Sequence, residues 1–192
     1  MQDKSATDNI HAITSAIKPF DKLEQQHVDE TLMWIESGAQ IFRIKKPDIP
    51  NKHLVSYFVL FDEAASKILL VDHKKAQLWL PAGGHVDINE DPKNTVKREC
   101  LEELGVPAEF WRDDPIFVTS TKTVGLTAGH TDVSLWYVLK GSENMHYTFE
   151  EREFNAIKWF SFDDIPYENS DPHLKRFMTK LKSLVKREKI IT

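Results

Sequence analysis

Three glutamates in the stretch from Asp91 to Gly105 are spaced as ligands on one side of a helix. At about 100° per residue, Glu99, Glu102 and Glu103 fall within roughly a third of the helical circumference. Like charges at this spacing destabilise an isolated helix by about 0.2–0.5 kcal/mol per pair, so the arrangement predicts a cation that offsets the repulsion. Mg²⁺ suits such a site because it prefers oxygen ligands and bridges a few carboxylates to substrate phosphates.

The helix that positions these glutamates has clear boundaries. Asp91 can cap its first turn, Pro92 suits the first helical position, and Gly105 suits the left-handed residue after the last turn. We expect the glutamates to lie on an exposed face. The opposite, buried face is predicted to consist of Val96, Cys100, Leu101 and Leu104.

A glycine pair precedes the helix in "WLPAGGHVD", which we interpret as a strand that enters a turn at Gly83–Gly84. Missing side chains let backbone amides and carbonyls approach a ligand or an ion closely, so this turn is a predicted binding element. His85 follows the pair, and it is expected either to contact a substrate phosphate or to be an ordinary surface histidine.

The segment 84–106 resembles the Nudix box of the Nudix hydrolases at every charged and glycine position. The match runs from Gly84 and Glu90 to the sequence "RECLEELGV", which begins at Arg98. Cys100 stands where the family usually has a larger aliphatic residue, and because free cysteine behaves as a small hydrophobe this departure affects packing and not chemistry. The resemblance implies water attack on a nucleoside diphosphate linked to a further moiety, with Mg²⁺ or Mn²⁺ bound.

The same resemblance implies roles for individual residues. Glu99, Glu102 and Glu103 become metal ligands and catalytic residues, with Glu99 or Glu103 also holding the water. The Gly83–Gly84 backbone becomes a further ligand or a substrate contact. Arg98 is expected to orient the carboxylates and to pair with Glu90 from the preceding loop.

Many relatives take a general base or an extra metal ligand from a glutamate outside the box. Here Glu150, Glu151 and Glu153 are candidates. We prefer Glu153, because it lies six residues before Trp159, where a family glutamate often precedes a strand containing tryptophan.

The remaining sequence alternates between strand and helix patterns. β-Branched and aromatic residues predict strands at 53–62, 67–73, 115–124, 131–141 and 156–162, and apolar spacing predicts helices at 21–38 and from Ser170 or Asp171 onward. Together with the resemblance, these patterns predict an α/β fold over residues 50–188. It is expected to be a Nudix-type α/β/α sandwich with a mixed sheet.

Residues 1–50 precede this pattern and are predicted to form an N-terminal helical extension, followed by a Nudix hydrolase domain at 51–192. Residues 1–19 have the composition of a weak helix or a loose arm. The helix at 21–38 could cap the site, cover a sheet edge or form a dimer contact, so a homodimer is left open.

Composition excludes several classes of function. The net charge of −5 disfavours a nucleic-acid binder, and no window reaches the roughly 18 apolar residues of a membrane span. One cysteine excludes an internal disulfide framework, and without a secretory signal we expect a cytoplasmic protein. The eight histidines form no local metal-binding motif, so zinc is not indicated.

Four further side chains have two interpretations each. His130 and Asp132 either form an ordinary turn into a strand or contact a ligand. Tyr57 and Trp79 either belong to the core or form a platform on which a base stacks.

The expected partner is a small-molecule nucleotide. Motifs associated with ADP-ribose, dinucleoside polyphosphate, NADH and coenzyme A enzymes are missing, which favours a nucleoside triphosphate, modified or deoxy forms included, cleaved to monophosphate and pyrophosphate. Alternatives are hydrolysis of another derivative, such as ADP-ribose or a nucleotide sugar, and a non-catalytic regulatory domain, which should have a damaged box. A prenyl diphosphate isomerase would need a catalytic cysteine in a strand, whereas Cys100 falls in the predicted helix.

Overall fold

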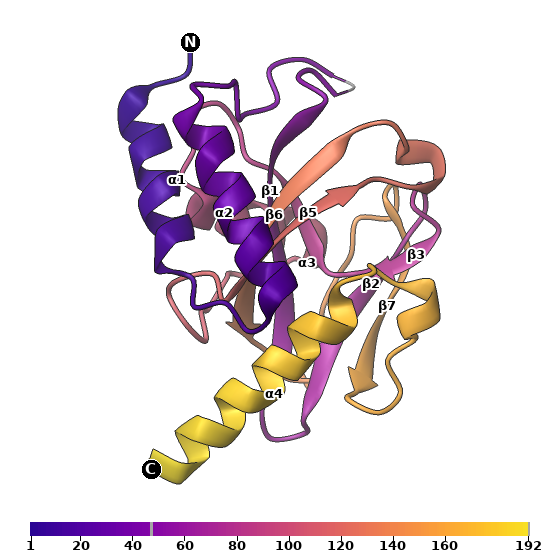
Figure 1. Ribbon diagram of the computed structural model, residues 1–192. Coiled ribbons are helices and arrows are strands. Elements are labelled where there is room, and N and C mark those ends of the chain that lie inside the picture. The colour runs from indigo at the N-terminus through magenta and orange to yellow at the C-terminus, as the bar shows by residue number, and fades with distance from the viewer. Residues whose placement is uncertain (47, 192) are drawn as a thin grey trace.

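A mixed β-sheet forms the middle layer of the computed structural model, with helices packed on both faces (Figure 1). The structure describes residues 1–46 and 48–191. Its helices are α1 (Lys4–Ala16), α2 (Lys22–Glu36), α3 (Pro92–Leu104) and α4 (Leu174–Ile191). Its strands are β1 (Lys52–Asp62), β2 (Lys67–His73), β3 (Leu78–Leu80), β4 (Ala82–His85), β5 (Phe117–Lys122), β6 (Thr131–Lys140) and β7 (Phe154–Ser161). Short 3₁₀ turns lie at Gly125–Thr127 and Tyr167–Asn169.

Strand β1 organises the sheet, whose order is β3-β2-β1-β6-β5, with β4 also paired to β1 and β7 to β2. β1 and β6 run parallel, while β2 and β4 pair with β1 in the antiparallel direction, so the sheet is mixed as predicted. The register places His53 beside Asp132 on β1 and β6, and Val55 beside His85 on β1 and β4. These pairings bring residues that are distant in sequence to one end of the sheet.

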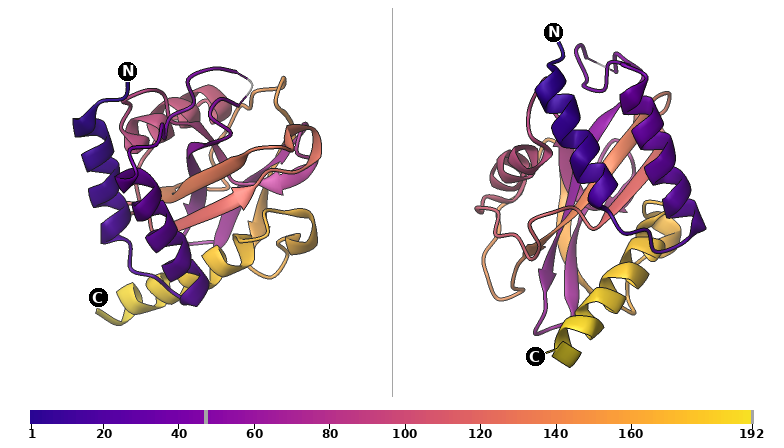
Figure 2. Two further views of the ribbon diagram at one scale, coloured as in Figure 1. Left: turned by 45° about the horizontal axis from the view of Figure 1, so that its top comes forward. Right: turned by 60° about the vertical axis from the view of Figure 1, so that its left-hand side comes forward.

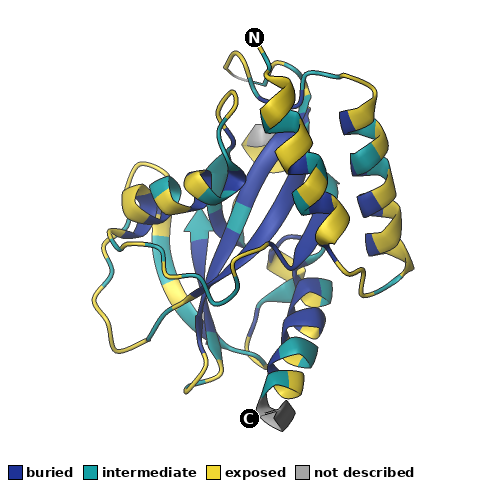
Figure 3. Ribbon diagram, turned by 90° about the vertical axis from the view of Figure 1, so that its left-hand side faces the viewer, coloured by how far each residue is buried: buried dark blue, intermediate teal, exposed yellow. Residues whose placement is uncertain are grey.

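Both faces of the sheet are buried. On β6, Val133 and Leu135 pack in the core cluster that includes α3, whereas Trp136 and Val138 pack in the cluster that includes α4. Figure 2 shows α3 and α4 on opposite faces of the sheet, and Figure 3 shows buried strands between helices with exposed outer sides. The predicted sandwich of helix, sheet and helix is therefore present.

The N-terminal residues form two helices. Asp3 accepts a hydrogen bond from the amide of Ser5 at the start of α1, so this segment is a helix and not a loose arm. α2 contacts the edge strand β5, and it therefore covers a sheet edge, while the dimer contact stays a prediction. Ile10 and Val28 join the core cluster of α3. The domain boundary at residue 50 also stays a prediction.

The glycine pair differs from expectation, because it lies inside strand β4 and not in a turn. Gly83 and Gly84 pair with Tyr57 and Ser56 of β1. A Cβ atom on Gly83 would lie 2.1 Å from the carbonyl oxygen of Ser56, so glycine is required for the close approach of the two backbones. Glycine is therefore needed here for close packing of two strands, whereas the sequence pattern alone had favoured a turn.

Asp171 precedes the C-terminal helix and caps it, as predicted. Its Oδ1 accepts a hydrogen bond from the amide of His173. α4 then packs Phe177 and Leu181 against the sheet. Among the helices that the structure describes, none is long and apolar enough to cross a membrane.

Candidate active site

Helix α3 begins and ends where its sequence predicts. Asp91 accepts a hydrogen bond from the amide of Lys93, and Pro92 occupies the first turn. Gly105 closes the helix in the left-handed conformation, with φ of 69°. These local signals fix the ends of the helix and the angles between its glutamates, whereas the neighbouring elements decide which face is buried.

The two faces of α3 are divided differently from the prediction. Leu101, expected to be buried, is 60% exposed, whereas Glu103, expected to be exposed, is only 5% exposed. Leu101 lies about 100° around the helix from Cys100 and leaves the buried sector, while Glu103 lies about 20° from Val96 and enters it. The glutamates therefore do not form a solvated row, and Glu103 points into the protein.

Strand β4 packs directly against the carboxylates of α3. The amide of Gly83 donates a hydrogen bond to Oε2 of Glu103 at 2.9 Å. A Cβ atom on Gly84 would lie 2.2 Å from Oε1 of Glu99, so any other residue here would displace this carboxylate. The oxygen-rich space beside the glycine pair fits a hard divalent cation, which coordinates carboxylate and carbonyl oxygens.

Burial and mutual repulsion act on these carboxyl groups. Burial, reinforced by the charge of Glu99, raises the pKa of Glu103 well above its usual value. Burial also raises the pKa of Glu99, although the neighbouring Arg98 opposes this shift. A bound cation would favour the ionised forms, which is the arrangement expected of a metal site.

Arg98 links α3 to the loop that precedes it. Its guanidinium lies 3.1 Å from Oε2 of Glu90 and 2.5 Å from Oε1 of Glu99. The oxygen of Glu102 is more distant at 3.8 Å, and the carbonyl of His85 accepts a hydrogen bond at 3.4 Å. Arg98 therefore orients Glu99 and anchors the end of β4, and it pairs with Glu90 as expected.

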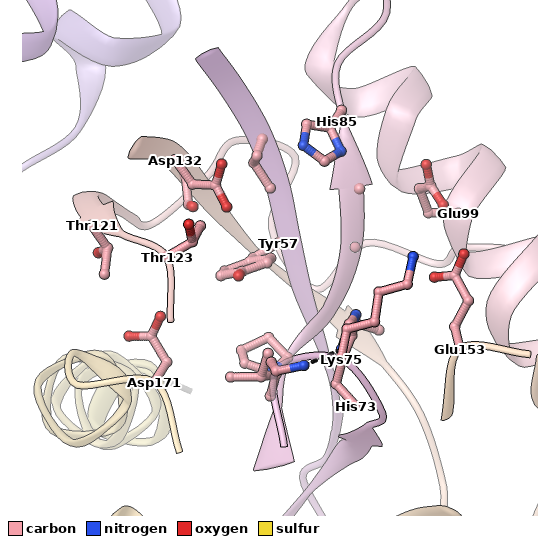
Figure 4. Close-up of a pocket in the computed structure, with 18 of the residues that line it drawn as sticks. Tyr57, His73, Lys75, His85, Glu99, Thr121, Thr123, Asp132, Glu153 and Asp171 are labelled. Carbon is pink, nitrogen blue, oxygen red and sulfur yellow. Dashed lines mark hydrogen bonds between the residues drawn. The ribbon is translucent and has the colours of Figure 1, made fainter. Parts of the chain in front are cut away.

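A cavity of about 1010 Å³ opens beside these groups, and it is lined by Glu99, Glu102, Glu103 and Arg98 together with Gly83, Gly84 and His85. Glu153 lines the same cavity, whereas Glu150 and Glu151 do not. In Figure 4, Glu99 and Glu153 point toward each other from α3 and from the loop before β7. The structure thus brings the predicted site residues together.

The opposite side of the cavity holds groups that the sequence did not reveal as site residues. Asp171, predicted only as a helix cap, lines the cavity, and burial raises its pKa to about 6. Tyr57 lies between this side and the glutamates in Figure 4 and belongs to the cavity wall. Trp79 packs edge-on against Phe160 and is not among the lining residues.

Three lysines from separate segments also line the cavity, namely Lys46 and Lys75 from loops and Lys122 from the end of β5. No local motif marks these residues, because each reaches the cavity through the packing of distant segments. They supply positive charge opposite the carboxylates of α3.

Histidines gather at the end of the cavity formed by β1, β4 and β6. The sequence allowed His130 to be either an ordinary turn residue or a ligand contact. In the structure it lies 3.2 Å from Asp132, and hydrogen bonding to this aspartate raises the pKa of His130. Burial lowers the pKa of His85 to about 3. His53 is fully buried beside them. Three histidines therefore lie together here, although their positions in the sequence do not form a metal-binding motif.

A family model described as a NUDIX domain matches residues 52–181. The chain belongs to the Nudix family. Its members hydrolyse pyrophosphate bonds in nucleotide-derived small molecules and use divalent metal ions. The Nudix fold predicted from the segment 84–106 is confirmed.

Solved Nudix structures share the arrangement. A NUDIX-family hydrolase from Clostridium perfringens is 24% identical, with a TM-score of 0.54 and coverage of 69% of this chain and 97% of its own. The NUDIX domain of Shewanella oneidensis NrtR, solved with ADP ribose, is 18% identical, with a TM-score of 0.56 and coverage of 69% and 87%. A C. elegans Ap4A hydrolase is 16% identical, with a TM-score of 0.52 and coverage of 69% and 98%. At these identities the likeness shows the fold alone, and no curated protein matches the chain significantly.

Proposed function

We propose that this Nudix protein is a metal-dependent pyrophosphohydrolase that cleaves a nucleoside triphosphate, modified or deoxy forms included, to the monophosphate and pyrophosphate. The observation that carries the proposal is the convergence of Glu99, Glu103 and Glu153 beside the glycine pair in one cavity. A volume of about 1010 Å³ reaches the upper end of the range for small-molecule sites, about 300–1,000 Å³.

We assign Glu99, Glu102 and Glu103 to the binding of Mg²⁺ or Mn²⁺, since an oxygen-only set of carboxylates suits these hard ions. When bound, the ion would neutralise phosphate charge and lower the pKa of a coordinated water. Arg98 contributes by holding Glu99 in place. The glycine pair keeps side chains out of the space between β4 and α3.

We assign the general base to Glu153, which accepts a proton from the attacking water. This glutamate is exposed to the cavity, and its charge is close enough to raise the pKa of Glu99 and of Glu103. His85 is assigned to a substrate phosphate. Its lowered pKa makes the ring neutral at pH 7, so it can donate one N–H to a phosphate oxygen without bringing a second charge.

Positive charge in the cavity supports a triphosphate in particular. Lys46, Lys75 and Lys122 line it together with Arg43 and Arg98. A triphosphate carries more negative charge than the diphosphate of ADP-ribose or of a nucleotide sugar, so it gains more from this set of cations.

The test is product analysis by chromatography after incubation with Mg²⁺ or Mn²⁺. The panel holds canonical and oxidised nucleoside triphosphates, ADP-ribose, nucleotide sugars and dinucleoside polyphosphates. We expect monophosphate and pyrophosphate from a triphosphate with the wild type and with Glu109→Gln, a control at an exposed glutamate paired with Lys140. Glu103→Gln should give far less product in the same time.

If only ADP-ribose or a nucleotide sugar is cleaved, the protein is still a pyrophosphohydrolase, but the proposed triphosphate substrate is wrong. Binding of nucleotide and metal without any cleavage would contradict the proposal and support a regulatory domain.

A further inference from the structure

A second group of ligand atoms gathers beyond the glutamates, and we call it the His/Asp cluster: Asp48, His53, His85, His130 and Asp132. One ligand atom from each of the first four residues lies within 4.8 Å of all the others. Asp132 adjoins them, with Oδ1 3.3 Å from Nε2 of His53 and 3.2 Å from Nε2 of His130. In Figure 4, Asp132 and His85 lie at the same end of the cavity.

The sheet register creates this cluster. His53 and Asp132 are direct neighbours on the parallel strands β1 and β6. His85 ends β4 and pairs with Val55, the next residue on the same face of β1 as His53. The side chains converge because three strands present them on one face, and His130 and Asp48 enter from adjoining loops.

His53 is oriented as a metal ligand. Its Nδ1 lies 2.7 Å from the carbonyl oxygen of Pro50, and because a carbonyl only accepts, Nδ1 carries the proton, so in the neutral ring Nε2 offers its lone pair. A backbone carbonyl on one ring nitrogen is a common way to aim the other at a metal.

The lone pair of His53 faces another acceptor. Its Nε2 and Oδ1 of Asp132 are both buried and lie only 3.3 Å apart, without a hydrogen bond of acceptable geometry between them. The side chain of His53 is 0% exposed. With the ring neutral, two acceptors at this distance in a buried site repel each other, so the pair is unfavourable unless a proton or a metal cation lies between them.

Two distances within the cluster match those of tetrahedral coordination. Zinc binds nitrogen or oxygen at about 2.0–2.2 Å, which places two ligand atoms of a tetrahedron about 3.4 Å apart. The separations of 3.3 Å and 3.2 Å around Oδ1 of Asp132 are close to this value. Asp48 lies 3.4 Å from Nδ1 of His130, where a carboxylate orients the ring.

We propose that the His/Asp cluster binds a transition-metal dication, with Zn²⁺ as the probe, through His53, His130, Asp132 and His85. Imidazoles suit Zn²⁺ whereas carboxylates alone suit Mg²⁺, so the cluster and the glutamates of α3 select different metals. The adjoining cavity, which Asp48, His85, His130 and Asp132 line, gives the ion a path to the site.

Arg43 is the cation that already contacts the cluster. Its Nη1 lies 3.3 Å from Nε2 of His85, and because arginine only donates, this nitrogen carries no proton and its lone pair accepts the hydrogen bond. The ion therefore competes with Arg43 for Nε2, while the other ring nitrogen of His85 remains free to meet a substrate phosphate.

The experiment measures metal binding and does not require activity, so its result is independent of the proposed hydrolase function. The full chain is stripped with a chelator and titrated with Zn²⁺ against a chromophoric chelator, in excess Mg²⁺ to occupy the glutamates. The variants are His53→Gln, His130→Asn and Asp132→Asn. The controls are His146→Asn, at an exposed histidine, and Glu102→Gln.

We expect one equivalent of Zn²⁺ in the wild type and in both controls, with affinity weakened on the order of 100-fold in each cluster variant. X-ray absorption of the zinc-loaded protein should show imidazole nitrogens. Circular dichroism checks folding, and if buried His53→Gln does not fold, His130→Asn and Asp132→Asn decide the result.

Equal affinity in His146→Asn and in folded cluster variants would overturn the proposal, as would an absorption spectrum with oxygen ligands only. Failure of the wild type to bind Zn²⁺ would also overturn it. Nitrogen NMR that finds both ring nitrogens of His53 protonated would then explain the cluster as a charged hydrogen-bond network.

Discussion

Two regions of the molecule surround their carboxylates in opposite ways. In the cavity, Glu99 and Glu103 lie close to each other and to Glu153, and burial raises the pKa of the first two. Arg98 contacts Glu99 but offers Glu103 no ion pair. Glu103 instead accepts a hydrogen bond from the neutral amide of Gly83.

Between α2 and α4, each carboxylate has its own cation. Asp21 is paired with Arg176, and Glu24, which is fully buried, is paired with Lys180 at 2.5 Å. Burial raises the pKa of Glu24 and lowers that of Lys180, so each charge depends on the other for compensation.

The difference separates residues that hold the fold from residues that serve function. A buried carboxylate that only stabilises the fold needs a compensating partner, and Glu24 has one. Glu103 keeps an uncompensated position beside a ligand cavity, where a bound cation would supply the missing charge. Local conflict of this kind is expected where function, and not stability, determines the residue.

The largest expected effect is that of Glu103→Gln on hydrolysis. Glutamine still accepts the hydrogen bond from Gly83 but cannot supply a negative charge, so we expect kcat to fall on the order of 10³-fold without loss of folding. In thermal unfolding, Mg²⁺ should stabilise the wild type and not the variant. Full activity in Glu103→Gln would place the metal elsewhere and remove the contrast between the two regions.

Lys180→Met should act on stability alone. The substitution leaves Glu24 buried without its cation, so we expect the free energy of unfolding to fall by about 3 kcal/mol, measured by urea unfolding. Lys180 does not line the cavity, and kcat should not change. The double variant Glu24→Gln/Lys180→Met should recover most of the loss, and a double variant as unstable as the single one would contradict this explanation.

The sequence predicts α3 well because its signals are local. Asp91, Pro92 and Gly105 define the ends, and the helical repeat sets the angles between glutamates. The repeat does not say which neighbour covers which sector, and for this reason Leu101 and Glu103 exchanged their expected exposure. That assignment depends on β4, which packs against the helix from outside the motif.

Residues brought together by the sheet register could not be predicted. His53, His85 and His130 are far apart in the sequence and form no local motif, although the structure brings them together. Zinc was not indicated by the sequence because only a local motif would have revealed it. Asp171 likewise carries a clear capping signal, which hides its place in the cavity. Both results depend on contacts between segments that are distant in the sequence, which one sequence does not specify.

The smallest effect concerns pH and the pair of Asp21 with Arg176. The hydrogen bond from Arg176 lowers the pKa of Asp21 from 3.8 to about 2. The ionised carboxylate therefore stabilises the folded state above about pH 4, and this contribution is lost as the pH falls toward 2. Because the side chain is 33% exposed, solvent screening reduces the contribution to about 1 kcal/mol.

Asp21→Asn isolates this contribution, since asparagine is an equally good cap for α2. Urea unfolding should show a deficit of about 1 kcal/mol at pH 7 that disappears near pH 2. Asp8→Asn, at an exposed aspartate paired with Lys4, is the matched control and should show little change at either pH. A deficit that is independent of pH would assign the loss to capping and not to charge. Compensation of buried carboxylates would then rest on Glu24 and Lys180 alone.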